Sequence, residues 1–398
     1  MRYYPNVKHE LLTTDRELAD LSRDLASAPQ IAFDTEFVSE DTYRPQLCLI
    51  QVAAAGRLIV IDPLKMNDLT PFWRALAEGT HETIVHAGRQ EIEFSLQAIG
   101  RPPRCLFDVQ IAAGMIGMEY PASYGALVSK MLGERPPKGE TRTDWRRRPL
   151  TERQLEYALA DVDHLALLRQ RLGERLDKLK HTSWFENEMA DWLSEVEGAR
   201  AGERWRKVSG SSGLPPRALA VVRELWRWRE SEAERRNFPV RRVLRDDLIV
   251  ELARRQSVDP KHIRAIRGME RGDIARVIPA LSAAVGRALD LPDADCPRVV
   301  RTDTNSHLNL LGQFLSSALA SICRNAAVAP SIVGTASDVR ELVAHMLSPE
   351  DGPPPLLAQG WRAEVVGQVL EDLLRGKLSI RISNPRSDHP LSIEPVRG

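Results

Sequence analysis

The sequence predicts an N-terminal α/β domain, a mixed sheet covered by helices, followed by all-helical domains. Three short runs rich in Ile, Val and Leu come first, at residues 31–37, 47–53 and 58–61, and β–α alternation follows them. From about residue 217 onward such runs disappear and amphipathic helical patterns dominate. This change of pattern predicts at least two kinds of domain.

The elements of the first half follow in order. A polar connection joins the first two strand-like runs, and a tight turn at Gly56 joins the second to the third. The next predicted elements are a helix at 69–77, a strand at 83–86, a helix at 90–99, and a short strand at 106–108 leading into 109–117. Thr151 and Gln154 then form a capping-box pattern, which predicts a helix from Glu152 toward Lys178.

Composition limits the class of protein. With 398 residues, 43% hydrophobic and 28% charged, the chain fits two or three folded domains. The N-terminus lacks the apolar run of a signal peptide, and no stretch approaches the length of a membrane span. The cysteines form no CxxC pair, which favours free buried thiols in a reducing cytoplasm: Cys48, Cys105, Cys296 and Cys323.

Two pairs of polar residues carry possible chemistry. Asp34 and Glu36 are two apart in a predicted strand, so both carboxylates lie on one face. Tyr157 and Asp161 are four apart on a predicted helix, so they share one face about 6 Å from each other. Each pair alone also fits a plainer interpretation, a solvated acid pair or a half-buried tyrosine beside a surface acid.

A further acid lies between these pairs at a strand–helix junction. Gly88 permits a sharp turn after the strand that ends at His86, and Glu91 falls in the first turn of the next helix. An acid there also fits a plain helix-terminal role, because negative charge is favoured at that end. The order of the three signals, however, is the pattern of the DEDD exonucleases in their tyrosine-bearing form.

The residues around these signals narrow the resemblance. The chain resembles the ribonuclease D family over residues 10–180, through IAFDTEF (31–37), TYRPQLCLIQ (42–51), VHAGRQEIEF (85–94), FDVQIAAG (107–114) and TRTDWRRRPLTERQLEYALADV (141–162). The resemblance implies a ribonuclease H-like fold and hydrolysis of RNA from its 3′ end, releasing nucleoside 5′-monophosphates. It also implies structured substrates such as tRNA precursors.

The resemblance further implies two divalent metal ions, Mg²⁺ or Mn²⁺, held by Asp34, Glu36, Glu91 and Asp161. Asp34 would bridge both ions, Glu36 and Asp161 would hold the ion on the water side, and Tyr157 would orient the attacking water. Hard cations prefer such oxygen ligands. The family normally has Asp at the position of Glu91, so this carboxylate sits one methylene further out, and we expect activity to be retained.

Contacts with nucleic acid are expected near this site. His86 either approaches the scissile phosphate or the terminal nucleotide, or is a satisfied residue at a strand end. Asp108 is expected to cap the next helix rather than to bind metal. The segment 135–148 holds six basic residues against two acids, so Arg142 and Arg146 are candidate phosphate contacts, with a solvated loop as the alternative.

A second basic segment, 223–245, holds eight arginines against four glutamates, although the whole chain has 55 residues of each sign. Arg227 and Arg229 are the candidate nucleic-acid contacts there. The region from Leu214 to about Leu289 resembles the HRDC domain, through residues 225–230, the break at 237–239 and Asp247-Leu248. Residues 306–378 look like a second, more divergent HRDC-like module, mainly through Gly360-Trp361-Arg362 and VVGQVLEDLLRGK (365–377). A helical bundle of this kind can equally serve as a spacer or bind a partner.

We therefore expect a 3′→5′ exonuclease domain at 1–198, an HRDC domain at 199–292, a second HRDC-like domain at 303–382 and a C-terminal tail at 383–398, with joints at 207–216 and 290–305. The run 379–398 alternates like a short hairpin. Two alternatives to an exoribonuclease stay open. One is a DNA 3′→5′ exonuclease, because proofreading enzymes use the same acids. The other is a catalytically weakened RNA-binding scaffold, although retention of four of the five site positions argues against it. The oligomeric state stays undetermined.

Overall fold

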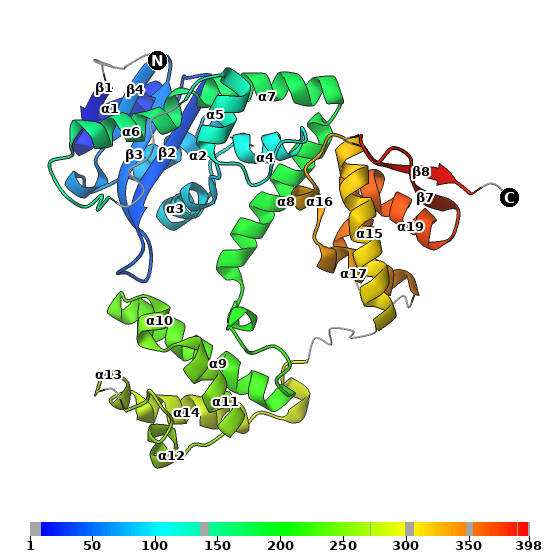
Figure 1. Cartoon of the computed structure of the whole chain (residues 1–398). Coiled ribbons are helices and arrows are strands. Elements are labelled where there is room, and N and C mark those ends of the chain that lie inside the picture. Colours follow the sequence, from blue (N-terminus) through cyan, green and yellow to red (C-terminus); the bar gives the residue numbers. More distant parts are fainter. Residues whose placement is uncertain are drawn as a thin grey trace.

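The computed structural model describes residues 9–135, 143–270, 272–298, 306–347, 353–387 and 389–396. An α/β domain comes first and two helical domains follow (Figure 1). This arrangement confirms the predicted fold class. No helix in the described ranges is long and apolar enough to cross a membrane.

The first domain is built on a mixed six-stranded sheet of order β1-β4-β3-β2-β5-β6. Strands β2, β3 and β4 form the predicted antiparallel meander, and β1, β5 and β6 each pair in parallel with a neighbour. The strands are β1 His9–Leu12, β2 Gln30–Val38, β3 Gln46–Ala54, β4 Arg57–Ile61, β5 Glu82–Val85 and β6 Leu106–Asp108.

Helices cover both faces of the sheet. Helices α1 and α2 pack on one face, where Phe33 of β2 contacts the rings of Phe72 and Trp73 edge-on. Helices α6 and α7 cover the other face. The helices of this domain are α1 Asp15–Leu25, α2 Thr70–Glu78, α3 Arg89–Ile99, α4 Val109–Gly114, α5 Tyr124–Leu132, α6 Glu152–Asp163, α7 Leu165–Leu179 and α8 Thr182–Ala201, with a 3₁₀ turn at Pro63–Lys65.

The helix predicted from Glu152 toward Lys178 is in fact two helices. Its predicted capping box is confirmed, but α6 ends at Asp163 and α7 begins at Leu165. At the break the backbone N–H of His164 donates to the hydroxyl of Tyr124 at 3.3 Å. A partner from a distant part of the chain thus ends α6, which the local pattern could not predict.

The HRDC-like domain has a hydrophobic core of its own. The segment 207–216, predicted as a joint, belongs to that core, because Val208 and Leu214 are buried in it. The helices are α9 Pro216–Arg236, α10 Val240–Val243, α11 Asp246–Arg255, α12 Pro260–Arg264, α13 Gly272–Ala275 and α14 Ile278–Leu289, with 3₁₀ turns at Trp205–Lys207 and Asp293–Asp295.

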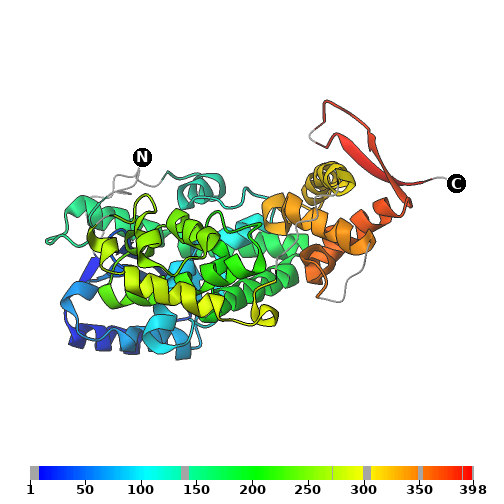
Figure 2. The ribbon, with the colours of Figure 1, turned by 90° about the horizontal axis from the view of Figure 1, so that it is seen from below.

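The C-terminal domain ends in a two-stranded hairpin that projects from its helices (Figure 2). The hairpin pattern predicted for the tail is confirmed, but it pairs residues on both sides of the predicted boundary at 382/383. The elements are α15 Ser306–Asn325, α16 Pro330–Val333, α17 Ala336–Leu347, α18 Gly360–Arg362, a π-helical turn at Ala363–Gly367, α19 Gln368–Leu374, β7 Leu378–Ile382 and β8 Leu391–Pro395, with a 3₁₀ turn at Leu356–Ala358.

The two helical domains open with the same series of elements. Each begins with a helix of 20 or 21 residues, continues through a residue of positive φ (Asn237 and Ala327), and forms a four-residue helix at a proline. A longer helix follows in both cases. This shared order supports the proposal that the C-terminal domain is a second HRDC-like module.

The C-terminal domain shares a hydrophobic core with the nuclease domain. The indole N–H of Trp361 donates to Glu188 of α8 at 3.1 Å, and Arg362 pairs with the same carboxylate at 2.7 Å. The backbone N–H of Ala329 donates to the carbonyl of Gly114 at 2.8 Å. The residues whose likeness suggested an HRDC-like module therefore also anchor it to the nuclease.

The HRDC-like domain meets the nuclease domain mainly through polar contacts. The connection between β2 and β3 reaches toward α10 (Figure 1). There the hydroxyl of Tyr43 donates to Glu230 at 3.2 Å, Arg44 pairs with Glu234 at 2.5 Å, and Arg242 pairs with Asp41 at 3.2 Å. We call residues 39–44 the hairpin tip.

All four cysteines are free, as predicted. Cys48, Cys296 and Cys323 are buried, but Cys105 is exposed, so the prediction that every thiol is buried is wrong at that position. Cys105 lies in the turn before β6 with φ of 46°, a position where the side chain points to solvent rather than into the sheet.

Candidate active site

The two acids of β2 lie on the face of the sheet that α6 covers. Asp34 pairs with Gln51 of β3 and Glu36 pairs with Leu49, and residues paired in this way share a face. Leu49 belongs to the small core formed under α6. A register shift follows Glu36, where the strand bends toward the hairpin tip. Both carboxylates are partly exposed at this end of the sheet.

Helix α6 brings Tyr157 and Asp161 over the same face. Thr151 and Gln154 form the capping box that begins the helix, and the two functional side chains follow on the side facing β2 and β3. The Tyr157 hydroxyl donates a hydrogen bond to Asp161. Trp145, from the segment before α6, stacks on the Tyr157 ring at 6.2 Å between centroids and so limits the positions of the phenol.

Glu91 is set apart from the other site residues because it is buried, with 4% of its surface exposed. Its carboxylate accepts a hydrogen bond of 2.5 Å from the hydroxyl of Thr35. Since side chains alternate along a strand, Thr35 projects from the face of β2 opposite to Asp34 and Glu36. The hydrogen bond to Glu91 therefore comes from the face of β2 opposite to the acid pair.

The loop before Glu91 has a strained backbone that Asp108 secures. Ala87 has φ of 54°, and the N–H groups of Ala87 and Gly88 both donate to the Asp108 carboxylate, at 3.2 and 2.9 Å. Asp108 also accepts from the N–H groups at the start of α4, so its predicted helix-capping role is confirmed. One buried carboxylate thereby fixes the N-terminal ends of both α3 and α4.

Burial and mutual repulsion perturb the four carboxylates. Burial first, and then repulsion from the other three acids, raises the pKa of Asp34 well above its usual value. Burial is also the main cause that raises the pKa of Glu36 to about 8, of Glu91 to about 7 and of Asp161 to about 6. The pKa of Tyr157 is raised as well, by burial and by Asp161, so the phenol stays protonated near neutral pH.

This set of donors fits hard divalent cations. Among the described residues, none of the principal causes that shift the pKa of the four carboxylates is a basic side chain. Mg²⁺ and Mn²⁺ prefer oxygen ligands of this kind. As the side chains stand, however, no three His, Cys, Asp or Glu residues in the described ranges form a group that could hold one ion.

His86 lies at the end of β5 beside the site. Its Nε2 is 2.9 Å from the carbonyl oxygen of Ala122, and its ring contacts Tyr124 edge-on at 5.7 Å. One ring nitrogen is therefore satisfied within the protein, as the plainer alternative expected.

The basic segment before α6 holds the two candidate phosphate contacts Arg142 and Arg146. Arg142 lies outside the described residues. Arg146 donates to Asp144 at 2.8 Å and to Asp41 of the hairpin tip at 3.3 Å. A phosphate at Arg146 would compete with both of these carboxylates.

The arginines of α9 differ from the sequence expectation. Arg229 is 4% exposed and donates to Asp246 and to the carbonyl of Leu244, so its contacts lie inside the HRDC-like domain and are at odds with a direct phosphate contact. Arg227 is more exposed, but Glu203 and Glu224 occupy its guanidinium. The sequence did not indicate these partners, because a basic run does not show which arginines turn inward.

Sequence reasoning missed Arg148 and Trp145 as supports of the site. Arg148 forms a two-point pair with the buried Asp62 at 2.6 and 2.7 Å and also donates to the carbonyl of Cys48. These bonds hold the segment bearing Trp145 against β3. The sequence signal was the aromatic residue inside an otherwise basic run.

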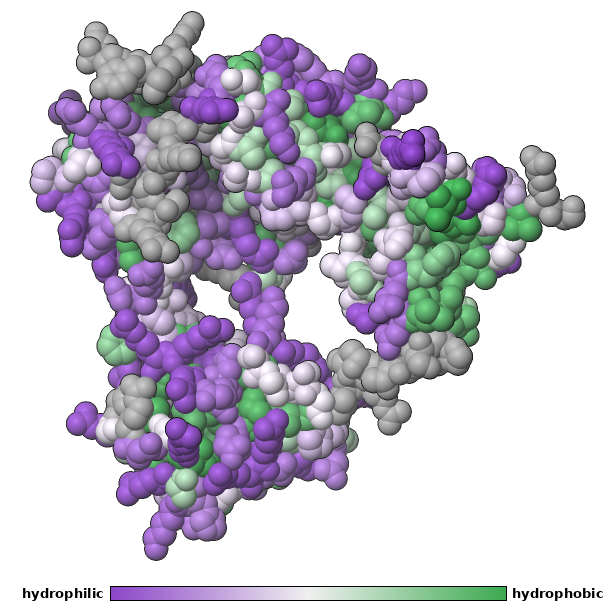
Figure 3. Space-filling view, in the orientation of Figure 1, coloured by the Kyte–Doolittle hydropathy of each residue, from purple (hydrophilic) through white to green (hydrophobic). Residues whose placement is uncertain are grey.

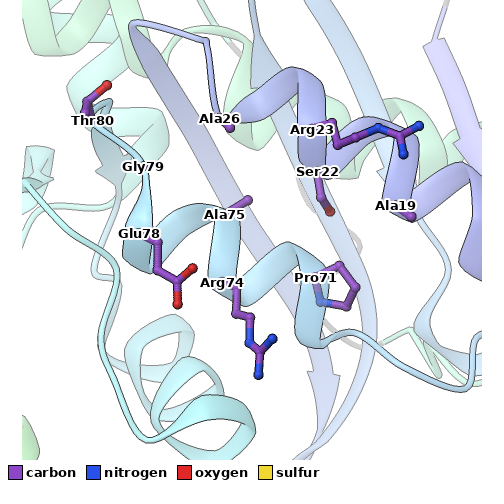
Figure 4. A pocket seen from close by; sticks show the side chains of 10 residues that line it. All are labelled: Ala19, Ser22, Arg23, Ala26, Pro71, Arg74, Ala75, Glu78, Gly79 and Thr80. Atoms are coloured by element: carbon purple, nitrogen blue, oxygen red, sulfur yellow. The ribbon is translucent and has the colours of Figure 1, made fainter.

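A groove of about 490 Å³ lies elsewhere, between α1 and α2 (Figure 4). It opens on the face of the sheet opposite to the carboxylates. Ala19, Ala26 and Ala75 contribute short side chains to it, while Arg23 pairs outside it with Asp20. The groove brings no set of catalytic groups together.

Comparisons with known proteins show the family of the chain. A family model described as 3′-5′ exonuclease matches residues 9–177, and the HRDC domain model matches residues 218–285. Ribonuclease D of Nitrobacter hamburgensis is 33% identical over 95% of this chain and 98% of its own, and ribonuclease D of Granulibacter bethesdensis is 34% identical over 94% of each.

A solved structure gives the same result. The crystal structure of Escherichia coli RNase D, described as an exoribonuclease involved in structured RNA processing, superposes with a TM-score of 0.80 at 28% identity. The match covers 93% of this chain and 99% of that one. The fold, the order of domains and the predicted enzyme class are thereby confirmed. The chain belongs to the ribonuclease D family and is a divalent-metal-dependent 3′→5′ exoribonuclease.

Proposed function

We propose that this enzyme trims the 3′ ends of structured RNA, such as tRNA precursors, in the cytoplasm, using two divalent ions, Mg²⁺ or Mn²⁺. The observation that carries the proposal is the group of four carboxylates with raised pKa, for which no described basic side chain is a principal cause. The description of the Escherichia coli relative as acting on structured RNA supports the substrate class.

Asp34 is the proposed ligand common to both ions, because repulsion from each of the other three carboxylates acts on it. Glu36 and Asp161 would share the ion on the water side. Two bound ions would activate the attacking water and stabilise the leaving oxygen. Every part of this ligand set comes from an element with fixed packing, β2 or α6.

Tyr157 is the proposed positioning group for the attacking water. Its hydroxyl proton is committed to Asp161, which leaves the phenol oxygen free to accept from a water molecule. The stacking of Trp145 restricts the ring. Because the raised pKa keeps the phenol protonated, Tyr157 is not the base that removes the proton from water.

Glu91 is proposed to act from its buried position. Its longer side chain reaches Thr35, where a 2.5 Å hydrogen bond restrains it. Repulsion between Glu91 and Asp34 shows that the two carboxylates remain close in electrostatic terms. We therefore retain Glu91 as a site residue that contributes negative charge toward the ions rather than as a fixed direct ligand.

RNA is proposed to reach the site past the hairpin tip. Asp41 there lies between Arg146 of the nuclease and Arg242 of α10. Both guanidiniums are partly exposed, so a phosphate can approach either one by displacing Asp41. Arg227 remains a weaker candidate contact.

The proposal is tested with purified full-length protein on RNA and DNA oligonucleotides labelled at either end, with Mg²⁺, Mn²⁺ or EDTA. Shortening of RNA from its 3′ end, dependent on metal and reduced at least about a thousandfold in Asp34→Ala, is expected. A tRNA precursor with a 3′ extension should be trimmed to a discrete product. Faster degradation of DNA than RNA, or RNA binding without shortening, would contradict the proposal.

A further inference from the structure

Gln51 is a buried polar residue beside the catalytic acids for which the mechanism above gives no role. It lies in the middle of the sheet on β3 and is 0% exposed. Neither its amide nitrogen nor its amide oxygen has a hydrogen-bond partner among the described residues. An unpartnered buried amide is unfavourable, because both groups have lost water without gaining a replacement.

The strand register determines what surrounds this amide. Gln51 pairs with Asp34 on one side and with Val60 of β4 on the other. Its neighbour on the same face of β3, Leu49, and the covering residue Ala158 of α6 are apolar. The carboxylate of Asp34 is therefore the cross-strand polar group that Gln51 faces.

The distance between the two strands allows the contact. Directly opposed residues in an antiparallel pair have Cβ atoms about 4.5–5.5 Å apart. A glutamine amide and an aspartate carboxylate can meet across that gap through side-chain rotation alone. The amide nitrogen is the atom that fits, because an ionised carboxylate only accepts hydrogen bonds.

We propose that Gln51 is the positioning residue of Asp34: its Nε2–H donates to the Asp34 carboxylate and orients it toward the divalent ions. The inference rests on the proposed role of Asp34 as a ligand of both ions. Groups that orient metal ligands in this way commonly contribute about ten- to a hundredfold to metal affinity or activity.

The test compares Gln51→Met, which keeps length and removes the donor, with Thr83→Val. Thr83 is a matched control, since its hydroxyl is also fully buried and unpartnered. It pairs with Ile31 on the opposite face of the sheet, away from the carboxylates. Gln51→Glu is a second variant at this position. Its side chain has the same length, and a carboxylate replaces the amide donor.

Three measurements on the full chain separate positioning from packing. Mn²⁺ binding without RNA is followed by electron paramagnetic resonance, kcat and KM are measured on an RNA oligonucleotide, and thermal unfolding is recorded. For Gln51→Met we expect Mn²⁺ affinity and kcat to fall about ten- to a hundredfold while KM stays within about twofold. The unfolding temperature of the metal-free protein should stay equal or rise, because in that state the amide has no partner among the described residues.

Gln51→Glu should weaken Mn²⁺ binding through lost orientation of Asp34, and Thr83→Val should match the wild type in all three measurements. The inference would be overturned if Gln51→Met kept the Mn²⁺ affinity and kcat of the wild type. It would also be overturned if Mn²⁺ affinity and kcat fell while the unfolding temperature dropped in both Gln51 variants, because packing would then explain the loss. If the wild-type chain itself binds no Mn²⁺ and leaves RNA intact, it is the proposed function that fails.

Discussion

The two helical domains open with the same series of elements but are attached to the nuclease in different ways. The C-terminal domain shares a hydrophobic core with the nuclease and inserts Trp361, 2% exposed, against α8. The HRDC-like domain has a separate core and meets the nuclease through ionic and polar side chains of the hairpin tip. Figure 3 shows the three domains arranged around an opening.

The difference indicates that two helical domains that open with the same series of elements can be attached to one nuclease domain in opposite ways. Burial of apolar surface is favourable by about 25 cal/mol per Å², so a shared core fixes one domain in place. Exposed ion pairs contribute about 0–1 kcal/mol each and weaken in salt. We therefore expect the C-terminal domain to unfold with the nuclease and the HRDC-like domain to reorient.

The largest effect is expected from Trp361→Ala. Loss of the buried indole, together with its bond to Glu188, should lower the free energy of unfolding by about 3–5 kcal/mol. Urea unfolding followed by hydrogen exchange should show the nuclease and the C-terminal domain weakened together. Trp228→Ala, which removes an indole packed on the HRDC-like core, is the control and should weaken that domain alone. A separate transition of the C-terminal domain, with the nuclease unchanged, would break the comparison.

A smaller effect should come from pH. Folding raises the pKa of Asp34 and of Glu36, the latter to about 8, so the metal-free nuclease is most stable when these groups are protonated. Stability should fall as pH rises from the usual carboxyl range through about 8.

Asp34→Asn in chelator should therefore stabilise the protein at pH 8, with the difference vanishing near pH 4. Hydrogen exchange should show this gain in the nuclease and the C-terminal domain and none in the HRDC-like domain. Equal stability of the variant and the wild type at pH 8 would contradict the assigned electrostatics.

Next come substitutions at the hairpin tip. Arg242→Ala with Tyr43→Phe should lower the free energy of unfolding by less than about 1 kcal/mol, because these contacts are partly exposed. Small-angle scattering should nevertheless show a wider distribution of domain positions. Arg23→Ala, which removes an exposed pair remote from the interface, should leave the scattering curve unchanged.

The smallest effect is expected from salt on the wild-type chain. Raising ionic strength from about 0.05 M to about 0.5 M shortens the screening length severalfold. The distribution of domain positions measured by small-angle scattering should widen, as in the Arg242 variant. The urea midpoint of the nuclease should stay constant. An HRDC-like domain that keeps its position at high salt would indicate an apolar contact instead.

Local patterns predicted much of this molecule. The alternation at Asp34 and Glu36 and the capping box of α6 depend on neighbouring residues alone, and both were found as expected. Helix α1 was not predicted, although Thr14 and Glu17 form the same kind of capping box.

The other differences between prediction and structure come from contacts between residues that are far apart in the sequence. Arg229 is buried because its guanidinium donates a hydrogen bond to Asp246, 17 residues later in the chain. The segment 207–216 looked like a joint from its glycines and serines, yet the core of the HRDC-like domain contains it. The position of the Glu91 carboxylate depends on Thr35, 56 residues earlier, and no local spacing predicts that hydrogen bond.

The shared core also has a consequence for the continuity of the chain. The C-terminal domain is joined to the nuclease covalently only through the HRDC-like domain, but its packing against α8 and α4 does not require that link. A protease cut between Arg298 and Ser306 should therefore leave the two fragments associated. The enzyme could be produced as two complementing pieces, with the peptide connection serving to raise local concentration rather than to hold the structure together.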